Sequence, residues 1–428
     1  MIDHPDRRGS GYEWQATLLL ALGFGLVALD RWIVVPLWPL IAHDLHLNYQ
    51  DQGTVVGVLA LAWGVFAVIF GRVSDGLGRR RVLIPAVILF SVLCGLTGVS
   101  AGLGMLIALR VLMGSTEGAF TPAAVAAVAE ASRDERRGLN QGFMLSTFPL
   151  FGLGFGPILA TQLLSVLPSW RWIFLVVALP GLIVAFLVFR LIREPSHLSA
   201  AEPQSAAGAV PAATIRWTQA LGRHNVIVGV LATCACMVGV FTLSGMISSY
   251  LTDAVHLSLA QMGFVTSAIG FGGFFGEFML PGLSDYIGRR WAAVLAFVLA
   301  FAALFVFSRT GQQLWTLFAL LFICTFFCFG LLALYTGPVA SEAVPPALIA
   351  SAIGLVSGIG EIFGGGVGPA LGGYVAQHYG IARMLNVAMA GLAAGALLSL
   401  FLRETAPRFT SASRKEKEPG GRRYLARP

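Results

Sequence analysis

The segment GRVSDGLGRRR, residues 71–81, lies between two long apolar runs and combines three glycines, one aspartate and four arginines. Glycines allow two helices joined by a short turn to approach closely, and Asp75 can accept hydrogen bonds from a helix N-terminus or an arginine across the loop. A partial copy of this loop recurs 210 positions later. The matched pairs are Asp75 and Asp285, Gly78 and Gly288, Arg79 and Arg289, and Arg80 and Arg290. The pattern predicts two copies of one structural unit.

The composition indicates a polytopic membrane protein. The chain has 428 residues, of which 57% are apolar and 11% charged, whereas soluble domains carry about 25% charged residues. The five cysteines all lie in apolar runs and are expected to be small buried hydrophobes. The net charge of +7 does not indicate nucleic-acid binding, because the basic residues gather in short segments between apolar runs.

Twelve apolar runs are long enough to cross about 30 Å of hydrocarbon. They predict an all-α protein with twelve transmembrane helices. The runs are 16–42, 53–72, 82–100, 104–129, 139–165, 170–192, 225–250, 260–283, 291–308, 313–340, 348–376 and 382–402.

A segment rich in Ala, Ser and Pro divides the chain into two halves of six runs each. We therefore expect two six-helix bundles in the same orientation, which is the arrangement of a parallel internal repeat. The predicted units are an N-terminal bundle at 1–195, a linker at 196–224, a C-terminal bundle at 225–403 and a tail at 404–428. Arginines are more frequent at the termini and in the linker than in the alternate loops. The positive-inside rule therefore predicts cytoplasmic termini in a bacterial-type plasma membrane.

The loop at 71–81 matches the signature between helices two and three of the major facilitator superfamily, and its partial copy is also typical of that superfamily. With twelve spans and a repeat of six, the resemblance covers essentially the whole chain. It implies the major facilitator fold and alternating access between two bundles. The expected conformational-gating residues are Gly71, Asp75, Gly78, Arg79, Arg80, Asp285 and Arg289.

Six ionisable residues lie deep within the predicted spans, away from their ends: Asp30, Arg31, Arg110, Glu117, Glu277 and Glu361. Each costs about 2.5–3.5 kcal/mol if isolated at mid-membrane, so we expect them to be paired, protonated or facing a wet cavity. Arg110 and Glu117 are seven residues apart and therefore share one helix face, about 10 Å apart along the axis, as two stations on a cavity wall. Asp30 and Arg31 point in different directions and are each expected to find a partner on the fourth span. The alternative is a structural network of buried ion pairs.

The segment ALDRWIVVPLWP, residues 28–39, resembles the Asp-Arg element in helix one of the anion:cation symporter family. Arg110 with Glu117 and the segment SWRWIFLV (169–176) are similar to further elements of that family. The resemblance implies that Arg31 binds the carboxylate of an organic anion and that Asp30 and Glu117 take part in proton coupling. It makes Arg110 a second cation at the site.

This chain departs from the family pattern after the Asp-Arg pair, where Trp32 to Val34 replace the usual polar asparagine. The change favours a less polar, aromatic carboxylate beside Trp32 and Trp38 over a hydroxyl-rich sugar acid.

The second half offers fewer candidates. Glu277 and Glu361 are either neutral acids held by the backbone or groups for coupling and cargo contact. Tyr250 and Tyr335 are either packing residues or contacts for the part of the cargo away from its carboxylate.

The sequence therefore predicts a monomeric proton-coupled importer of an organic anion, in which acids release an arginine when they take up protons. The alternatives are an efflux antiporter for amphipathic compounds and a membrane sensor. Patterns for a nucleotide-binding loop, a catalytic triad or a zinc protease are absent, so an enzyme, a cofactor and a metal site are not expected.

Overall fold

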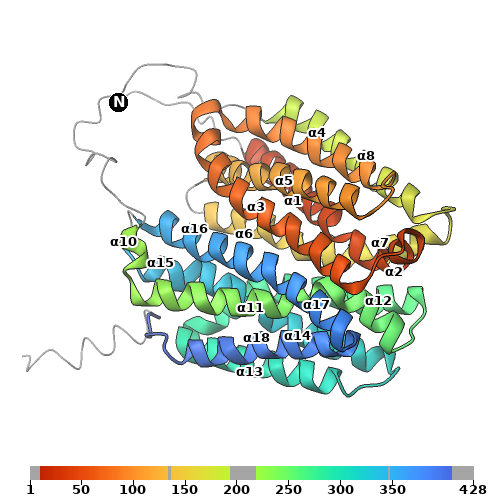
Figure 1. The fold of residues 1–428 in the computed structure, drawn as a ribbon. Coiled ribbons are helices and arrows are strands. Elements are labelled where there is room, and N and C mark those ends of the chain that lie inside the picture. Colours follow the sequence, from red (N-terminus) through yellow and green to blue (C-terminus); the bar gives the residue numbers. More distant parts are fainter. Residues whose placement is uncertain (1–9, 134–135, 193–217, 346–347, 407–428) are drawn as a thin grey trace, which may run out of the picture.

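The computed structural model describes residues 10–133, 136–192, 218–345 and 348–406. Within these ranges, twelve helical spans are long and apolar enough to cross a membrane, so the chain is a multi-pass membrane protein. Their ends agree with the predicted runs to within a few residues. Two bundles of six spans lie side by side, with α1 to α8 in one and α11 to α18 in the other (Figure 1).

The N-terminal bundle contains a broken first span and a fifth span with a π-helical segment, η1. Its elements are α1 (Ser10–Trp32), α2 (Val34–Leu45), α3 (Tyr49–Leu77), α4 (Arg79–Thr97), α5 (Leu103–Ala131), α6 (Arg137–Phe148), η1 (Pro149–Phe155), α7 (Gly156–Leu164) and α8 (Trp170–Leu191).

The C-terminal bundle repeats this order and contains three π-helical segments, η3, η4 and η6. Its elements are α10 (Thr218–Leu221), α11 (His224–Ser249), η3 (Tyr250–Ala254), α12 (Leu259–Ile287), α13 (Arg289–Phe307), α14 (Leu314–Leu334), η4 (Tyr335–Val339), α15 (Ala340–Glu342), α16 (Ile349–Ile359), η6 (Gly360–Val367), α17 (Gly368–Tyr379), η7 (Ile381–Arg383) and α18 (Met384–Ser399).

The helix junctions follow from local sequence. Asn48 begins α3 with a capping box to Asp51, and Ser258 begins α12 with the same device to Gln261. Gly78 and Gly288 separate the second and third spans of each bundle at φ 99° and 96°. A side chain at that φ would be strained, which explains the repeated glycine of the two loops.

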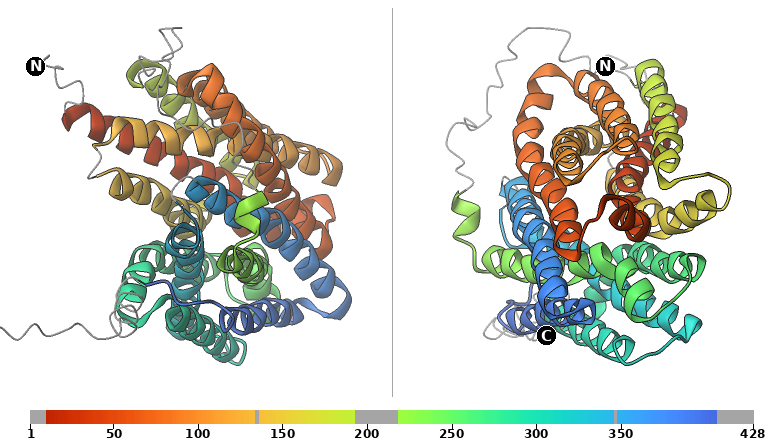
Figure 2. Two further views of the ribbon diagram at one scale, coloured as in Figure 1. Left: turned by 90° about the vertical axis from the view of Figure 1, so that its left-hand side faces the viewer. Right: turned by 45° about the vertical axis from the view of Figure 1, so that its right-hand side comes forward.

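The two bundles are in closest contact near one end, here named the distal end, where α2 finishes and α3 begins. The other end, where α1 begins and α8 finishes, is named the linker end. On the distal half a Cβ added to Gly53 or Gly57 of α3 would collide with the carbonyl oxygens of Pro369 and Gly366. Gly270 of α12 is equally close to the backbone of Gly154 in η1. Backbone therefore packs directly on backbone along α3 with η6 and α17, and along α12 with η1 (Figure 2).

Hydrogen bonds reinforce this distal contact. The Tyr49 hydroxyl donates to Asp253 Oδ2 at 2.8 Å. Gln52 Nε2 donates to the Gly245 carbonyl at 2.8 Å, and Gln52 Oε1 accepts from Ser249 Oγ at 2.7 Å. On the linker half, a Cβ on Gly142 of α6 or Gly358 of α16 would meet nothing within 4 Å. The molecule is thus sealed at the distal end and has open space toward the linker end.

Some predicted features fall outside the described residues. They are most of the linker at 196–224, the tail from 407 onward, the surroundings of Gly71 and the side chain of Asp75.

Candidate functional site

A cavity of about 300 Å³ lies between the bundles, in the half nearer the linker end. Helices of both bundles line it, including α1, α3 and α6 on one side and α11, α12, α14 and α16 on the other. Its volume is at the lower end of the range of small-molecule sites, roughly 300–1,000 Å³. The wall is largely apolar, and six of its residues are aromatic: Phe24, Trp63, Phe148, Phe241, Phe278 and Phe329.

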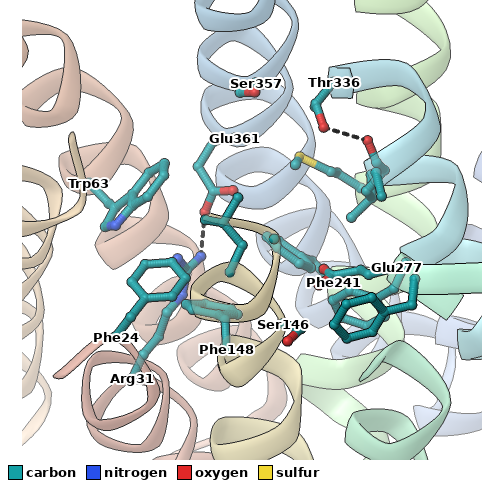
Figure 3. A pocket seen from close by; sticks show the side chains of 17 residues that line it. Phe24, Arg31, Trp63, Ser146, Phe148, Phe241, Glu277, Thr336, Ser357 and Glu361 are labelled. Carbon is teal, nitrogen blue, oxygen red and sulfur yellow. Dashed lines mark hydrogen bonds and ion pairs between the residues drawn. The ribbon is translucent and has the colours of Figure 1, made fainter. Parts of the chain in front are cut away.

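Arg31 and Glu361 form an ion pair across the two bundles at this cavity. Arg31 Nη2 donates to Glu361 Oε1 at 2.5 Å, and the two side chains are only 4% and 7% exposed. Figure 3 shows them pointing toward one another, Arg31 from α1 and Glu361 from η6. The sequence prediction of a partner on the fourth span differs from this structure, because η6 lies opposite α1 at this depth.

The guanidinium of Arg31 is held among aromatic rings. Its central carbon lies 5.5 Å from the ring centroid of Trp32, 5.7 Å from that of Phe148 and 5.4 Å from that of Phe241. Arg31 Nε is buried and has no hydrogen-bond partner among the described residues. The single bond to Glu361 therefore leaves part of the guanidinium fork unused, and a fork of this kind can bind a carboxylate through two bonds.

Asp30, Arg110 and Glu117 lie behind this site, inside the N-terminal bundle. Each is at most 1% exposed, and none lines the cavity. Arg110 Nη1 donates to the backbone carbonyls of Asp30 and Arg31 at 3.3 and 3.1 Å. The sequence placed Arg110 on the cavity wall, whereas the structure turns it toward the break between α1 and α2.

Both acids of this inner group carry unused hydrogen-bonding capacity. Neither oxygen of Glu117 has a hydrogen-bond partner among the described residues, and neither does Asp30 Oδ1. Asp30 faces the Cys94 thiol, while Glu117 is under the electrostatic influence of Arg31 and Arg110. Unpaired buried charge is costly, so this arrangement suits groups whose protonation changes.

The remaining candidates of the second half separate into two groups. Glu277 of α12 lines the cavity. Tyr250 packs on Phe307, and the Tyr335 hydroxyl hydrogen-bonds to Ser399 Oγ at 2.6 Å. Both tyrosines are buried away from the cavity. The position of each therefore agrees with packing rather than with contact to a cargo.

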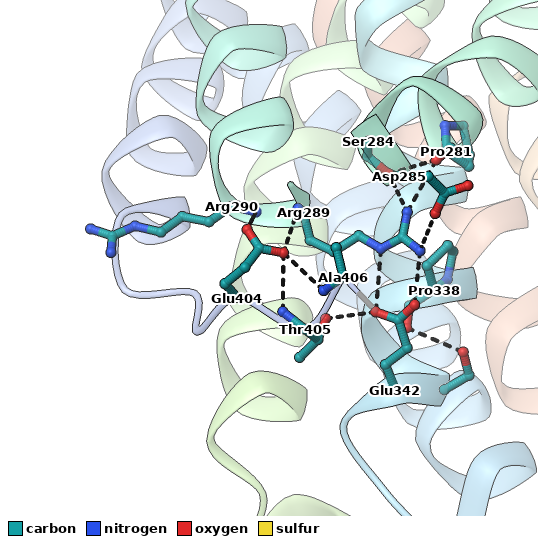
Figure 4. A network of polar contacts seen from close by, with 11 residues as sticks. Pro281, Ser284, Asp285, Arg289, Arg290, Pro338, Glu342, Glu404, Thr405 and Ala406 are labelled. Carbon is teal, nitrogen blue, oxygen red and sulfur yellow. Dashed lines mark hydrogen bonds and ion pairs between the residues drawn. The ribbon is translucent and has the colours of Figure 1, made fainter. Parts of the chain in front are cut away.

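The repeated arginine loops form networks within their own bundles at the linker end. Arg79 pairs with Glu130 at 3.1 Å. Arg289 pairs with Asp285 at 2.6 Å and with Glu342 at 2.8 Å, and Glu404 accepts from the backbone N–H groups of Arg289 and Arg290 (Figure 4). Such contacts can stiffen each bundle as a rigid body. Arg80 lies over the ring of Phe189.

Sequence reasoning missed several polar and aromatic groups of the cavity wall. Ser146, Thr336 and Ser357 supply hydroxyls, and Trp63 supplies the aromatic surface that was expected from Trp32 and Trp38. Single serines and tryptophans in apolar runs carry no distinguishing pattern, so only the spatial arrangement identifies them. Across the described ranges, no group of three or more His, Cys, Asp or Glu side chains is arranged to hold a metal ion.

The family model described as Major Facilitator Superfamily matches residues 20–250 and 229–427. The chain belongs to the Major Facilitator Superfamily. The expected fold of two six-helix bundles is therefore confirmed, and so is the expectation of a transporter rather than an enzyme.

Three relatives match between 60% and 86% of the chain. A putative metabolite transport protein of Haemophilus influenzae is 27% identical over 382 residues, covering 86% of this chain and 91% of that protein. A probable 4-methylmuconolactone transporter of Cupriavidus pinatubonensis is 28% identical over 377 residues, with 85% and 84% covered. The quinolone resistance protein NorA of Staphylococcus aureus is 26% identical over 266 residues, with 60% and 61% covered.

The fold is similar to that of a bacterial homologue of the human lysosomal transporter Spinster, in an inward-facing crystal structure. The TM-score is 0.71 at 18% identity, and the match covers 95% of this chain and 98% of that one. At this identity the likeness shows the superfamily fold.

Proposed function

We propose that the protein is a proton-coupled importer of an organic carboxylate anion in a bacterial inner membrane, with both termini in the cytoplasm. The observation that carries this proposal is Arg31, a buried cation on the cavity wall with an unused guanidinium edge. Within the described part of the chain, the Arg31 side chain makes one hydrogen bond, to Glu361, whereas a planar guanidinium fork can bind both oxygens of a carboxylate.

Proton coupling is proposed for the acids around this cation. Glu361 and Glu277 line the cavity, while Asp30 and Glu117 stand behind it with unused oxygens. Protonation of an acid removes a competing negative charge from the neighbourhood of Arg31, which favours entry of an anion. With the linker end facing the cytoplasm, the cavity would open inward, and alternating access would open the distal end to the outside.

The test uses purified protein and a panel of benzoate, phenylacetate and hexanoate. We expect at least one of them to raise the melting temperature more strongly at acidic than at neutral pH, because binding stabilises the folded state by mass action. Arg31→Gln should abolish the shift. Arg403→Gln is the matched control, since Arg403 follows α18 outside the cavity. An unchanged shift in Arg31→Gln would refute the carboxylate site.

The second candidate is proton-driven efflux of amphipathic compounds. The aromatic wall and Glu277 favour it, and the relative NorA is named for quinolone resistance. Resistance to a cationic amphipath on expression, lost in Glu277→Gln and without carboxylate uptake, would select this function.

A further inference from the structure

We propose that, in the empty transporter, the Glu361 carboxylate occupies the position on Arg31 where the cargo carboxylate binds. Binding of one monocarboxylate with an apolar body then displaces Glu361, which takes up one proton. This inference rests on the proposed function and specifies its cargo and its proton site. In the structure, Glu361 approaches Arg31 from the opposite bundle and presents a carboxylate oxygen at 2.5 Å. That is the contact which a carboxylate cargo would make.

The exchange balances in charge and in protons. Before it, the Glu361 carboxylate neutralises the Arg31 guanidinium. A cargo carboxylate then binds Arg31, and the Glu361 carboxylate takes up one proton from the same solution as a neutral acid. The charges of Arg31, Glu361 and the cargo therefore sum to zero in both the resting and the loaded state.

The two partly loaded states each contain an uncompensated charge. A proton on Glu361 without cargo leaves Arg31 unpaired, and cargo without a proton leaves Glu361 unpaired. Breaking a buried pair from one side is strongly unfavourable, whereas replacing one partner by another of the same charge is not. The geometry therefore opposes both proton leak and uncoupled anion movement.

Other groups around Glu361 leave this assignment intact. The acids nearby are Glu117 of α5, which senses Glu361 electrostatically, and Glu277 of α12 across the cavity. From α11, packed against η6, the Cys234 thiol donates to the Ile359 carbonyl instead. Among the described residues, Arg31 is the cation that Glu361 contacts.

The cargo class follows from the rest of the wall. Apart from Arg31, the charged side chains that line the cavity are the two acids Glu277 and Glu361. One cation accommodates one carboxylate, and a second carboxylate would meet Glu277 or aromatic rings. Phe24, Trp63 and Phe148 favour an apolar or aromatic body, and about 300 Å³ limits its size.

The experiment measures proton and charge balance in vesicles that contain the full-length protein. For the wild type we expect one proton per benzoate, uptake that does not respond to an imposed membrane potential, and benzoate affinity that falls about tenfold per pH unit where Glu361 is ionised. Succinate should bind at least tenfold more weakly than hexanoate. A ratio other than one proton per benzoate, or uptake driven by the membrane potential, would overturn the inference from measurements on the wild type alone.

Glu361→Gln tests the residue itself. A neutral Gln cannot compete with cargo for the Arg31 guanidinium, so benzoate affinity should no longer depend on pH. The variant should still exchange benzoate across the membrane but should not accumulate it in response to a pH gradient. Asp44→Asn also removes one carboxylate, at a site outside the cavity where Asp44 pairs with Arg171, so it should retain the pH dependence. Equal behaviour of the two variants, or proton-driven accumulation in Glu361→Gln, overturns the assignment to Glu361. If only Arg31→Gln loses carboxylate binding, the proposed function is supported whichever way the Glu361 variant behaves. If the wild type binds no carboxylate, both the proposed function and the role of Glu361 are refuted.

Discussion

The hydroxyl of Tyr49 on α3 donates a hydrogen bond to the carboxylate of Asp253 on η3, and this bond joins the two bundles at the distal end. Residues 204 positions apart in the chain thus meet at the rim of the seal. Alternating access requires this contact to break whenever the distal end opens. Changing this bond should therefore shift the equilibrium between the distal-closed and distal-open states.

Removal of this hydroxyl should favour the distal-open state. Asp253 is exposed and also accepts a hydrogen bond from Thr252, so the net contribution of the Tyr49 bond is about 0.5–1.5 kcal/mol, and Tyr49→Phe should raise the distal-open fraction about 2- to 10-fold. Spin labels at Val166 and Gly311, in distal loops of the two bundles, would report the change as a longer distance population. The exposed Tyr379 provides the matched control, and an equal response in Tyr379→Phe would contradict the role of the hydroxyl.

The glycine contacts of α3 give a sharper prediction. Gly53→Ala should prevent distal closure, because its Cβ would collide with the Pro369 carbonyl. Gly358→Ala is the control, since its Cβ meets no neighbour within 4 Å. Both changes favour helix formation by about 1 kcal/mol, so both proteins should fold. Only Gly53→Ala should shift the spin-label distances and stop transport; full transport in that variant would refute the proposed seal.

Arg110 should act by positioning Arg31 rather than by touching cargo. Its guanidinium binds two carbonyls beside the break at Ile33, where Pro36 provides no backbone N–H for the carbonyl of Trp32. We expect Arg110→Gln to reduce benzoate affinity and to destabilise the fold by about 1–3 kcal/mol, because the buried carbonyls of Asp30 and Arg31 lose their donor. Benzoate binding should keep its dependence on pH. A melting temperature equal to that of the wild type would argue against this positioning role.

Trp63 should select for aromatic cargo. Contacts between aromatic groups contribute about 0.5–1.5 kcal/mol beyond their buried area. Trp63→Ala should therefore weaken phenylacetate binding about 3- to 10-fold more than hexanoate binding. Trp315, which is 73% exposed at the start of α14, supplies the matched control. An equal loss for both acids in Trp63→Ala would contradict aromatic selection.

The membrane spans and the internal repeat could be predicted from the sequence because both depend on local pattern. An apolar run of sufficient length forms a spanning helix almost regardless of its neighbours. Gly78 and Gly288 share a left-handed conformation for the same local reason, namely a tight connection between consecutive helices. These features needed no knowledge of which helices meet.

The partners of the buried charges could not be predicted in the same way. Arg31 and Glu361 are 330 positions apart, and helical periodicity gives the face of a residue without naming the helix opposite. The sequence identified both residues as candidates but assigned Arg31 a partner on the fourth span. Tyr335 shows the same limit, because its partner Ser399 seals it into the bundle. The roles of the coupling acids stay predictions for the experiments above.

Gly53 and Gly57 pack directly against carbonyl oxygens, so closure of the distal end requires little rearrangement of side chains there. Side chains that interlock must find one rotamer at each closure and lose up to about 2 kcal/mol of entropy each. Glycine has no rotamer to find. A junction made largely from main-chain atoms can therefore re-form identically in every turnover, with little ordering of side chains along this seam.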